Sequence, residues 1–123
     1  MKRDMDLVRV ILQKVEACNN PWGLHETLNI EGYNQNEISY HIKLLNDAGL
    51  LEAQEVSSMG PDGFRWWPGR LTWAGQDFLD AAKDDTLWKK AKETVIKPGA
   101  SYTFDILLAW LKSQVGTVLG LPT

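Results

Sequence analysis

The hydrophobic pattern at the start of the chain predicts a helix. Apolar side chains recur at spacings of three and four, which is typical of a helix that buries one face. They are Leu7, Val8, Ile11, Leu12 and Val15. We expect the helix to cover residues 4–17, and to be ended by Asn19, Asn20, Pro21 and Gly23.

The pattern then changes to alternation. Leu28 and Ile30 alternate with polar neighbours just before Gly32. Alternation is the period of a strand with one buried side. We predict a short strand here, followed by a turn at Gly32.

A second helix is predicted between Gln35 and Ala48. Asn34 followed three residues later by Glu37 resembles a capping box, and Gly49 is a suitable residue just past the helix end. At about 100° per residue one side of this helix is apolar and should face the core. It carries Ile38, Ile42 and Leu45, with His41 and Ala48 at its flank.

The opposite side of this helix is polar. Its side chains can hydrogen-bond base edges or phosphates, as in a helix that reads DNA. A solvated helix surface has the same composition, so both interpretations stay open. The residues are Asn36, Ser39, Tyr40, Lys43, Asn46 and Asp47.

A hairpin is predicted after the helix. Residues 50–56 form one strand, residues 57–63 the turn, and residues 64–67 a return strand closed by Pro68 and Gly69. Phe64 and Trp66 then point to one side, Arg65 and Trp67 to the other. Helix, hairpin and a further helix is the order of a winged helix.

Three basic residues are the candidates for phosphate contacts at this hairpin: Lys43, Arg65 and Arg70. Alternatively, the two arginines cover the tryptophans by cation–π stacking. Trp67 could stack on a base or sugar, or form part of a protein interface.

The region after the hairpin is helical. Thr72 is a candidate N-cap, and Ala74, Phe78, Ala81 and Ala82 mark a packed face. A restart is expected at Asp84-Asp85-Thr86, with Trp88, Ala91 and Val95 continuing the face to Pro98-Gly99. Asp77, Asp80, Asp84 and Asp85 form an acidic surface, which repels DNA and can attract a basic partner.

The last helix is expected at residues 103–119. Its stripe consists of Phe104, Leu107, Leu108, Leu111, Val115 and Val118, while Ile106 and Trp110 lie outside it. A helix that is apolar on more than one side is buried by its own core or by a second subunit. We therefore predict a homodimer contact through Ile106, Trp110, Leu111 and Val118.

Composition sets limits on class. A chain of 123 residues with 44% hydrophobic residues predicts one domain, with a core over 1–83 and a helical extension over 84–123. The net charge of −3 counts against a free-standing DNA-binding domain, which is usually basic. The start MKRDMDL is not a signal peptide, and Asp105 and Lys112 interrupt the longest apolar tract, so we expect a cytoplasmic protein with no membrane span.

Enzyme and metal motifs are missing from the sequence. One cysteine and two histidines provide neither an internal disulfide nor a zinc set. Ser39 and His41 diverge by about 200° on a helix, so they cannot act as a pair. We expect no catalysis, no metal and no small-molecule cofactor.

Three segments carry a family resemblance: MKRDMDLVRVIL, GYNQNEISYHIKLLNDAGLLEA and LTWAGQDFLDAAKDDTLW. Together they resemble a family of small bacterial and phage proteins catalogued as domain of unknown function 2513. The resemblance implies a winged-helix-like fold and an origin in bacteria, phages or prophages. It implies no activity and no catalytic residues.

The sequence therefore predicts an α+β, mostly helical, winged-helix-like domain with a two- or three-stranded wing sheet and extra C-terminal helices. It departs from the usual winged helix, because only one helix fits between Gly32 and Gly49. Either a short turn within residues 21–27 or the C-terminal helix replaces the preceding helix. The favoured function is a transcriptional regulator that binds double-stranded DNA. The alternative is a module that binds a host or defence protein.

Overall fold

The chain forms five helices and a two-stranded sheet within residues 1–97 and 102–118, the part that the computed structural model describes. The elements are α1 (Met5–Glu16), α2 (Gln35–Asp47), β1 (Leu51–Glu55), β2 (Trp66–Leu71), α3 (Trp73–Ala82), α4 (Asp85–Thr94) and α5 (Phe104–Val118). They divide into two compact units, Met1–Gln76 and Asp77–Thr123. This division lies inside α3, whereas the sequence predicted a boundary at residue 83.

Helix α1 is confirmed with its predicted buried face. Asp4 is the N-cap, and its carboxylate accepts hydrogen bonds from the backbone N–H groups of Asp6 and Leu7. Such a cap satisfies donors that have no partner within the helix. All five predicted apolar side chains are buried, and Met5 joins them.

Helix α2 begins and ends as its sequence predicts. The Asn34 side chain accepts from the Glu37 N–H, and the Glu37 carboxylate accepts from the Asn34 N–H, which completes the capping box. Gly49 follows with φ +76°, a left-handed conformation that favours glycine. The prediction that Ala48 lies at the flank of the apolar side is wrong, because Ala48 is exposed.

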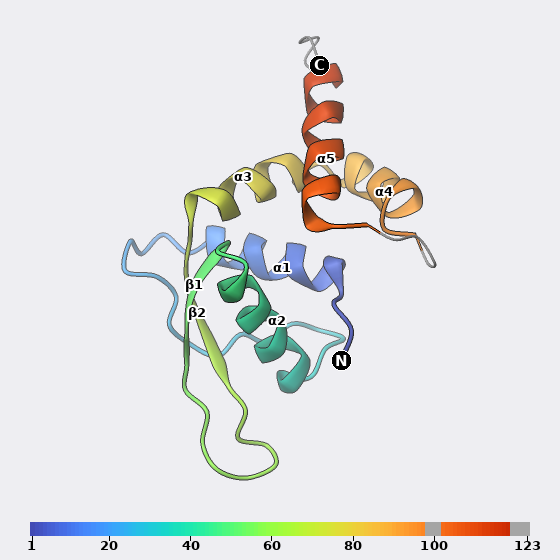
Figure 1. Cartoon of the computed structure of the whole chain (residues 1–123). Helices are drawn as coiled ribbons and strands as arrows, with labels where there is room; N and C mark the ends of the chain where they lie inside the picture. The colour runs from blue at the N-terminus through green and yellow to red at the C-terminus, as the bar shows by residue number, and fades with distance from the viewer. Residues whose placement is uncertain (98–101, 119–123) are drawn as a thin grey trace. The chain divides into compact units, whose positions relative to one another are not determined.

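Helices α1 and α2 pack against each other and against the hairpin of β1 and β2 (Figure 1). The strands are antiparallel, with Glu55 opposite Trp66 and Leu51 opposite Leu71. The expected end of the second strand at Pro68 and Gly69 is wrong, because both residues lie within β2. The strand register shifts between Leu51 and Ala53, opposite these residues. Proline within a strand is usually found at such irregularities.

The segment between α1 and α2 contains no strand and no helix. The strand predicted at Leu28 and Ile30 is wrong, although both side chains are buried. The chain instead turns at Pro21 and runs along β2, where the Leu24 N–H donates to Gly69 O and the His25 N–H donates to Pro68 O. A turn with an extended segment thus connects α1 to α2.

A buried histidine joins α1 to α2. His41 is 2% exposed, and its Nδ1 lies 2.8 Å from the Glu37 carbonyl one turn earlier. Since a carbonyl can only accept, Nδ1 carries the proton, and Nε2 accepts from the Asp4 N–H at 2.8 Å. The Tyr33 hydroxyl donates to the Asp4 carboxylate at 3.0 Å. Asp4 therefore connects three segments of this unit.

The second unit has an aromatic and aliphatic core. Phe78 packs against Trp88 and Phe104, with ring centroids 6.4 and 5.0 Å apart. Asp84 is the N-cap of α4, as predicted. Among the described residues, no helix is long and apolar enough to cross a membrane.

Two details of the helical region differ from the prediction. Ala74 is exposed and does not belong to the packed face, whereas Phe78, Ala81 and Ala82 are buried as predicted. The stop at Pro98-Gly99 lies outside the described residues, and α4 ends at Thr94.

The variant His41→Phe tests the hydrogen bonds by which His41 connects α1 to α2. Phenylalanine has a similar volume but leaves the Asp4 N–H and the Glu37 carbonyl without their side-chain partner. We expect the free energy of unfolding to fall by about 1–3 kcal/mol, the usual cost of unsatisfied buried groups. Urea unfolding followed by circular dichroism measures it, with Asn36→Ala on the exposed side of α2 as the control. Equal stabilities of the two variants would contradict this role.

Tyr33 gives a second test of the same contacts. Burial, followed by the hydrogen bond to Asp4, raises its pKa to about 12. The unfolded phenol ionises near pH 10, so the stabilisation is complete below pH 10 and is lost as the pH rises to about 12. Phenolate absorbance of the wild type minus that of Tyr33→Phe should have its midpoint near 12. Asp4→Asn should lower it, and a wild-type midpoint near 10 would show that the contact is absent.

Candidate functional site

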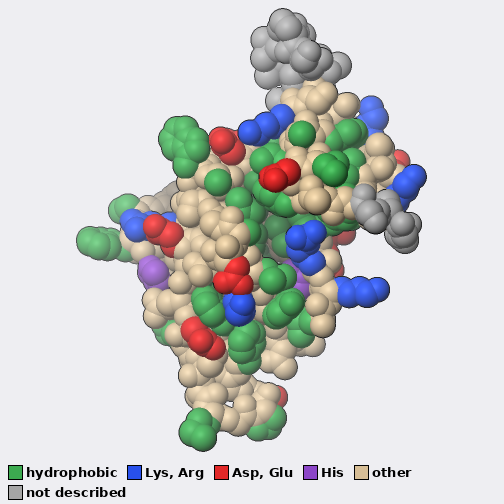
Figure 2. Space-filling view, viewed as in Figure 1, with side chains coloured by type: hydrophobic (Ala, Val, Ile, Leu, Met, Phe, Trp, Pro, Cys, Tyr) green, Lys and Arg blue, Asp and Glu red, His purple; other side chains and the backbone are tan. Residues whose placement is uncertain are grey.

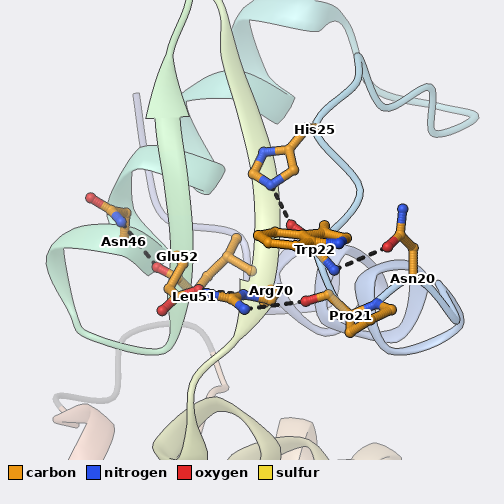
Figure 3. Close-up of polar contacts among 8 residues, drawn as sticks. All are labelled: Asn20, Pro21, Trp22, His25, Asn46, Leu51, Glu52 and Arg70. Atoms are coloured by element: carbon orange, nitrogen blue, oxygen red, sulfur yellow. Dashed lines mark hydrogen bonds and ion pairs between the residues drawn. The ribbon is translucent and has the colours of Figure 1, made fainter.

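Arg70, a predicted phosphate contact, is engaged within the chain. Its Nε donates to the Glu52 carboxylate at 2.8 Å, and its Nη1 donates to the Pro21 carbonyl at 3.2 Å. Figure 3 shows the guanidinium between these two partners, which come from β1 and from the loop after α1. Arg70 therefore fastens that loop to the hairpin, and Glu52 offsets its charge.

Lys43 is also paired. Its ammonium lies 2.7 Å from the carboxylate of Asp47, one turn further along α2. The hydrogen bond to Asp47 raises the pKa of Lys43 above its ordinary value. A DNA phosphate would have to compete with this carboxylate. The predicted cluster of Lys43, Arg65 and Arg70 thus contains two cations with acidic partners of their own.

Ser39 does not lie on the exposed side of α2. It is 1% exposed, and its hydroxyl accepts a hydrogen bond from the Trp66 N–H at 3.2 Å. This contact fixes α2 to β2. The prediction that Ser39 faces a ligand is wrong, because the hairpin covers this side of the helix.

The other polar residues of α2 differ in exposure. Asn36 is exposed. Tyr40 is half-buried, and its ring lies edge-on to His41 with centroids 5.8 Å apart. Asn46 donates from Nδ2 to the Leu51 carbonyl at 3.0 Å, so it closes the link between α2 and β1. Asn36, part of Tyr40 and the ion pair of Lys43 with Asp47 are the parts of the predicted polar face that stay exposed.

The predicted site residues of the hairpin make hydrogen bonds within the chain. Trp67 is half-buried and donates from Nε1 to the Thr27 hydroxyl at 3.1 Å. Arg65 is half-buried, and its backbone N–H donates to the Ser57 hydroxyl at 2.9 Å. The indole N–H of Trp66 is buried with no acceptor in the described structure.

Charge in the Met1–Gln76 unit is unfavourable for DNA. Its sequence contains seven Lys and Arg against ten Asp and Glu, a net charge of −3. On the face shown in Figure 2, the basic side chains of the described residues are interspersed with acidic ones. Since binding to DNA rests mainly on neutralised phosphates, this surface lacks the main source of affinity.

Two tryptophans that the sequence reasoning missed are the most exposed aromatic side chains described. Trp22 is 79% exposed in the turn after α1, and Trp73 is 86% exposed at the start of α3. Their positions carried a signal, because Trp22 lies between Pro21 and Gly23 and Trp73 follows the helix cap Thr72. Turns lie at the surface, and both indoles are mostly exposed there.

A cavity of about 210 Å³ lies in the same unit as these tryptophans. Its wall includes the end of α1, the following turn, β2 and the first turn of α3. Glu16, Cys18, Pro21, Gly23, Arg70 and Gln76 are among the lining residues. Trp22 lies between two lining residues in sequence, and Trp73 lies one helical turn before a third.

The predicted dimer residues of α5 lie in the second unit. Ile106 is 54% exposed and Trp110 is half-buried, so both present surface to a partner. Leu111 is fully buried within the chain. Its predicted place in a subunit interface is wrong, because it is part of the core. The side chain of Val118 lies outside the described residues, and the homodimer stays a prediction.

The described part of the chain contains no cluster of metal-binding side chains. No group of three or more His, Cys, Asp or Glu side chains there is close enough to hold an ion. Cys18 is a free, half-buried thiol at the wall of the cavity.

Comparison with known proteins places the chain in a family. The model of the family described as "Hypothetical protein (DUF2513)" matches residues 2–101. An uncharacterized protein of Haemophilus influenzae is 34% identical over 119 residues, covering 97% of this chain and 96% of the relative. No solved structure matches. The chain belongs to the DUF2513 family, as the resemblance of its three sequence segments predicted.

Proposed function

We propose that this chain is a protein-binding module with a winged-helix-like order of elements. Helix α2, the hairpin of β1 and β2, and helix α3 follow one another as in winged helices. The observation that carries the proposal is the exposure of Trp22 and Trp73 on a unit with a net charge of −3. Tryptophan is enriched at protein interfaces and among the residues that dominate their binding energy.

The internal contacts of the polar residues support a protein ligand over DNA. Ser39 and Asn46 bond to β2 and β1, so neither side chain is directed to base edges. The charges of Lys43 and Arg70 are offset by Asp47 and Glu52. The exposed tryptophans, in contrast, have large apolar areas that a partner could remove from water.

DNA binding is the second candidate, and two observations favour it. The order of elements is that of DNA-binding winged helices, in which the helix before the hairpin enters the major groove. Asn36 is exposed on that helix, and Arg65 lies at the hairpin. A transcriptional regulator would use these two residues together with Tyr40 and Lys43.

Paired tryptophan variants test the protein-binding proposal. We expect the tagged chain to retain a specific protein from extracts of the organism that encodes it, and Trp22→Ser combined with Trp73→Ser to lose that protein. Met59→Ser is the matched control, because Met59 is an exposed large apolar side chain as well but lies in the hairpin turn. Mass spectrometry of the three eluates makes the comparison. Equal retention by the double variant would refute the role of the tryptophans.

A salt titration tests DNA binding. The proposed protein-binding function predicts no change in the fluorescence anisotropy of genomic duplex fragments at roughly 50 mM salt, where phosphate-driven binding is strong. Binding that weakens steeply toward roughly 200 mM, and a salt slope reduced by about one on Arg65→Ala, would establish DNA as the ligand. Glu31→Ala serves as a control for nonspecific effects of substitution.

A further inference from the structure

Strand β1 has one edge that no other strand covers within the described residues. The sheet contains two strands there, so β1 pairs with β2 on one side only. We infer that the free edge binds an extended, basic segment of a partner protein, which adds to the sheet as a further strand. The inference goes beyond the proposed function, because it depends on neither Trp22 nor Trp73.

The strand register determines which backbone groups of β1 point to the free edge. The Val56 N–H donates to the Arg65 carbonyl at 2.9 Å, so the backbone groups of Val56 face the returning strand. In an antiparallel pair the backbone groups of successive residues point alternately toward the partner strand and away from it. Counting back from Val56, Glu55 and Ala53 therefore direct their N–H and C=O groups away from β2.

The residues of β2 opposite these two show the same alternation. Trp66, opposite Glu55, donates its N–H to a side chain of α2 instead of to β1. Pro68, opposite Ala53, has no N–H, and its carbonyl accepts from the His25 N–H. Both residues direct their backbone groups away from β1, as is required of the partners of outward-pointing residues.

The neighbouring backbone groups of the sheet have partners. Residues 24 and 25 donate to the far edge of β2. At the start of β1, the Asn46 amide donates to the Leu51 carbonyl at 3.0 Å, as Figure 3 shows. The outward groups of Ala53 and Glu55 have no partner among the described residues. Each offers one N–H and one C=O, the groups with which an edge strand binds an extended peptide.

The free part of the edge lacks two common obstacles to pairing. Proline and bulges often protect edge strands from a further strand. The stretch Leu51–Glu55 contains no proline, and its register shift lies between Leu51 and Ala53, ahead of the free groups. A further strand can therefore pair with Ala53 and Glu55 without crossing the irregularity.

The acidic side chains of β1 decide which strand fits. Glu52 is paired with Arg70, whereas the exposed Glu55 carboxylate accepts one hydrogen bond, from the neutral Ser57 hydroxyl at 2.8 Å. Directly across a ladder, an opposite charge is favourable and a like charge is unfavourable. An arginine or lysine opposite Glu55 therefore fits. The net charge of −3 on this unit attracts a basic segment at longer range.

A second copy of the chain fits this edge less well. Two β1 strands side by side would bring Glu52 and Glu55 of both copies into one sheet, between two units that each have a net charge of −3. Lys43 of α2 interacts with Glu55 at a distance, but its ion pair is with Asp47, at 2.7 Å. The acidic edge thus disfavours self-association and favours a basic partner.

Amide hydrogen exchange tests the edge at the two residues concerned. The probe is acetyl-Thr-Arg-Val-Arg-Val-Thr-amide, a short strand-forming peptide, and NMR of the isotope-labelled full chain follows the exchange of the Ala53 and Glu55 amides. We expect both amides to exchange about threefold more slowly at about 2 mM peptide, the protection that a Kd of about 1 mM gives.

Three analogues of the peptide separate backbone pairing from charge. When an arginine lies opposite Glu55, the arginine N–H groups face β1, so methylation of both arginine nitrogens should abolish the protection. Methylation of both valine nitrogens alters the other edge of the peptide and should keep the protection. The analogue with glutamate in place of both arginines should give none.

A variant of the chain tests the charge on the other side of the contact. Glu55→Gln can keep the bond to Ser57 but removes the charge. The protection should fall to about 1.5-fold, which corresponds to about fourfold weaker binding, within the range of cross-strand charge pairs. Glu31→Gln is the matched control, because it removes an exposed carboxylate elsewhere in the unit and should keep the full protection.

Several results would overturn the inference. They are no protection by the arginine peptide, equal protection by the glutamate analogue, equal protection by the two methylated analogues, and full protection in Glu55→Gln. Slow exchange of Ala53 and Glu55 without peptide, if it increases with protein concentration, would also overturn it, because a second copy would then occupy the edge. Capture of a protein through Trp22 and Trp73 is independent of these results, so the proposed function would still stand.

Discussion

The constraint on which the Met1–Gln76 unit depends is that the buried polar groups of α2 must find hydrogen-bond partners inside the fold. The Ser39 hydroxyl accepts a hydrogen bond from the Trp66 N–H in β2. The His41 ring bonds to the Asp4 N–H and to the Glu37 carbonyl of its own helix. Leaving such groups unsatisfied costs more than the bonds themselves contribute. Helix α2 is therefore fixed in rotation and along its axis by two polar contacts on either side of its apolar face.

This constraint decides which residues remain for a ligand. The bonds of Ser39 and Asn46 to the hairpin use side chains that a DNA-reading helix would present outward. The loop after α1, fastened to β2 through Arg70, in turn presents Trp22 at the surface. The same contacts that build the fold thus withdraw polar groups from one face and expose aromatic area at another.

Local sequence signals predicted the elements well, because capping and periodicity act within a few residues. The capping box at Asn34 and the restart at Asp84 are confirmed, and so is the first helix, which its apolar periodicity predicts; the N-cap role of Asp4 was not predicted. The errors arose where the partner is distant in sequence. The residues around Ser39 in sequence do not indicate its hydrogen bond to Trp66, which is 27 residues away. The ion pair of Arg70 with Glu52 likewise depends on the register of the two strands. Leu28 and Ile30 alternate as in a strand, yet the backbone bonds of this segment to β2 are made by residues 24 and 25.

The most direct test of the central claim is fluorine NMR of the chain labelled with 5-fluorotryptophan, whose six tryptophans include Trp22 and Trp73. Single Trp→Phe variants assign the signals. We expect the purified partner to shift or broaden the signals of Trp22 and Trp73, and duplex DNA to change none. A change at Trp66 or Trp67 on adding duplex DNA, with Trp22 and Trp73 unaffected by any protein, would contradict it.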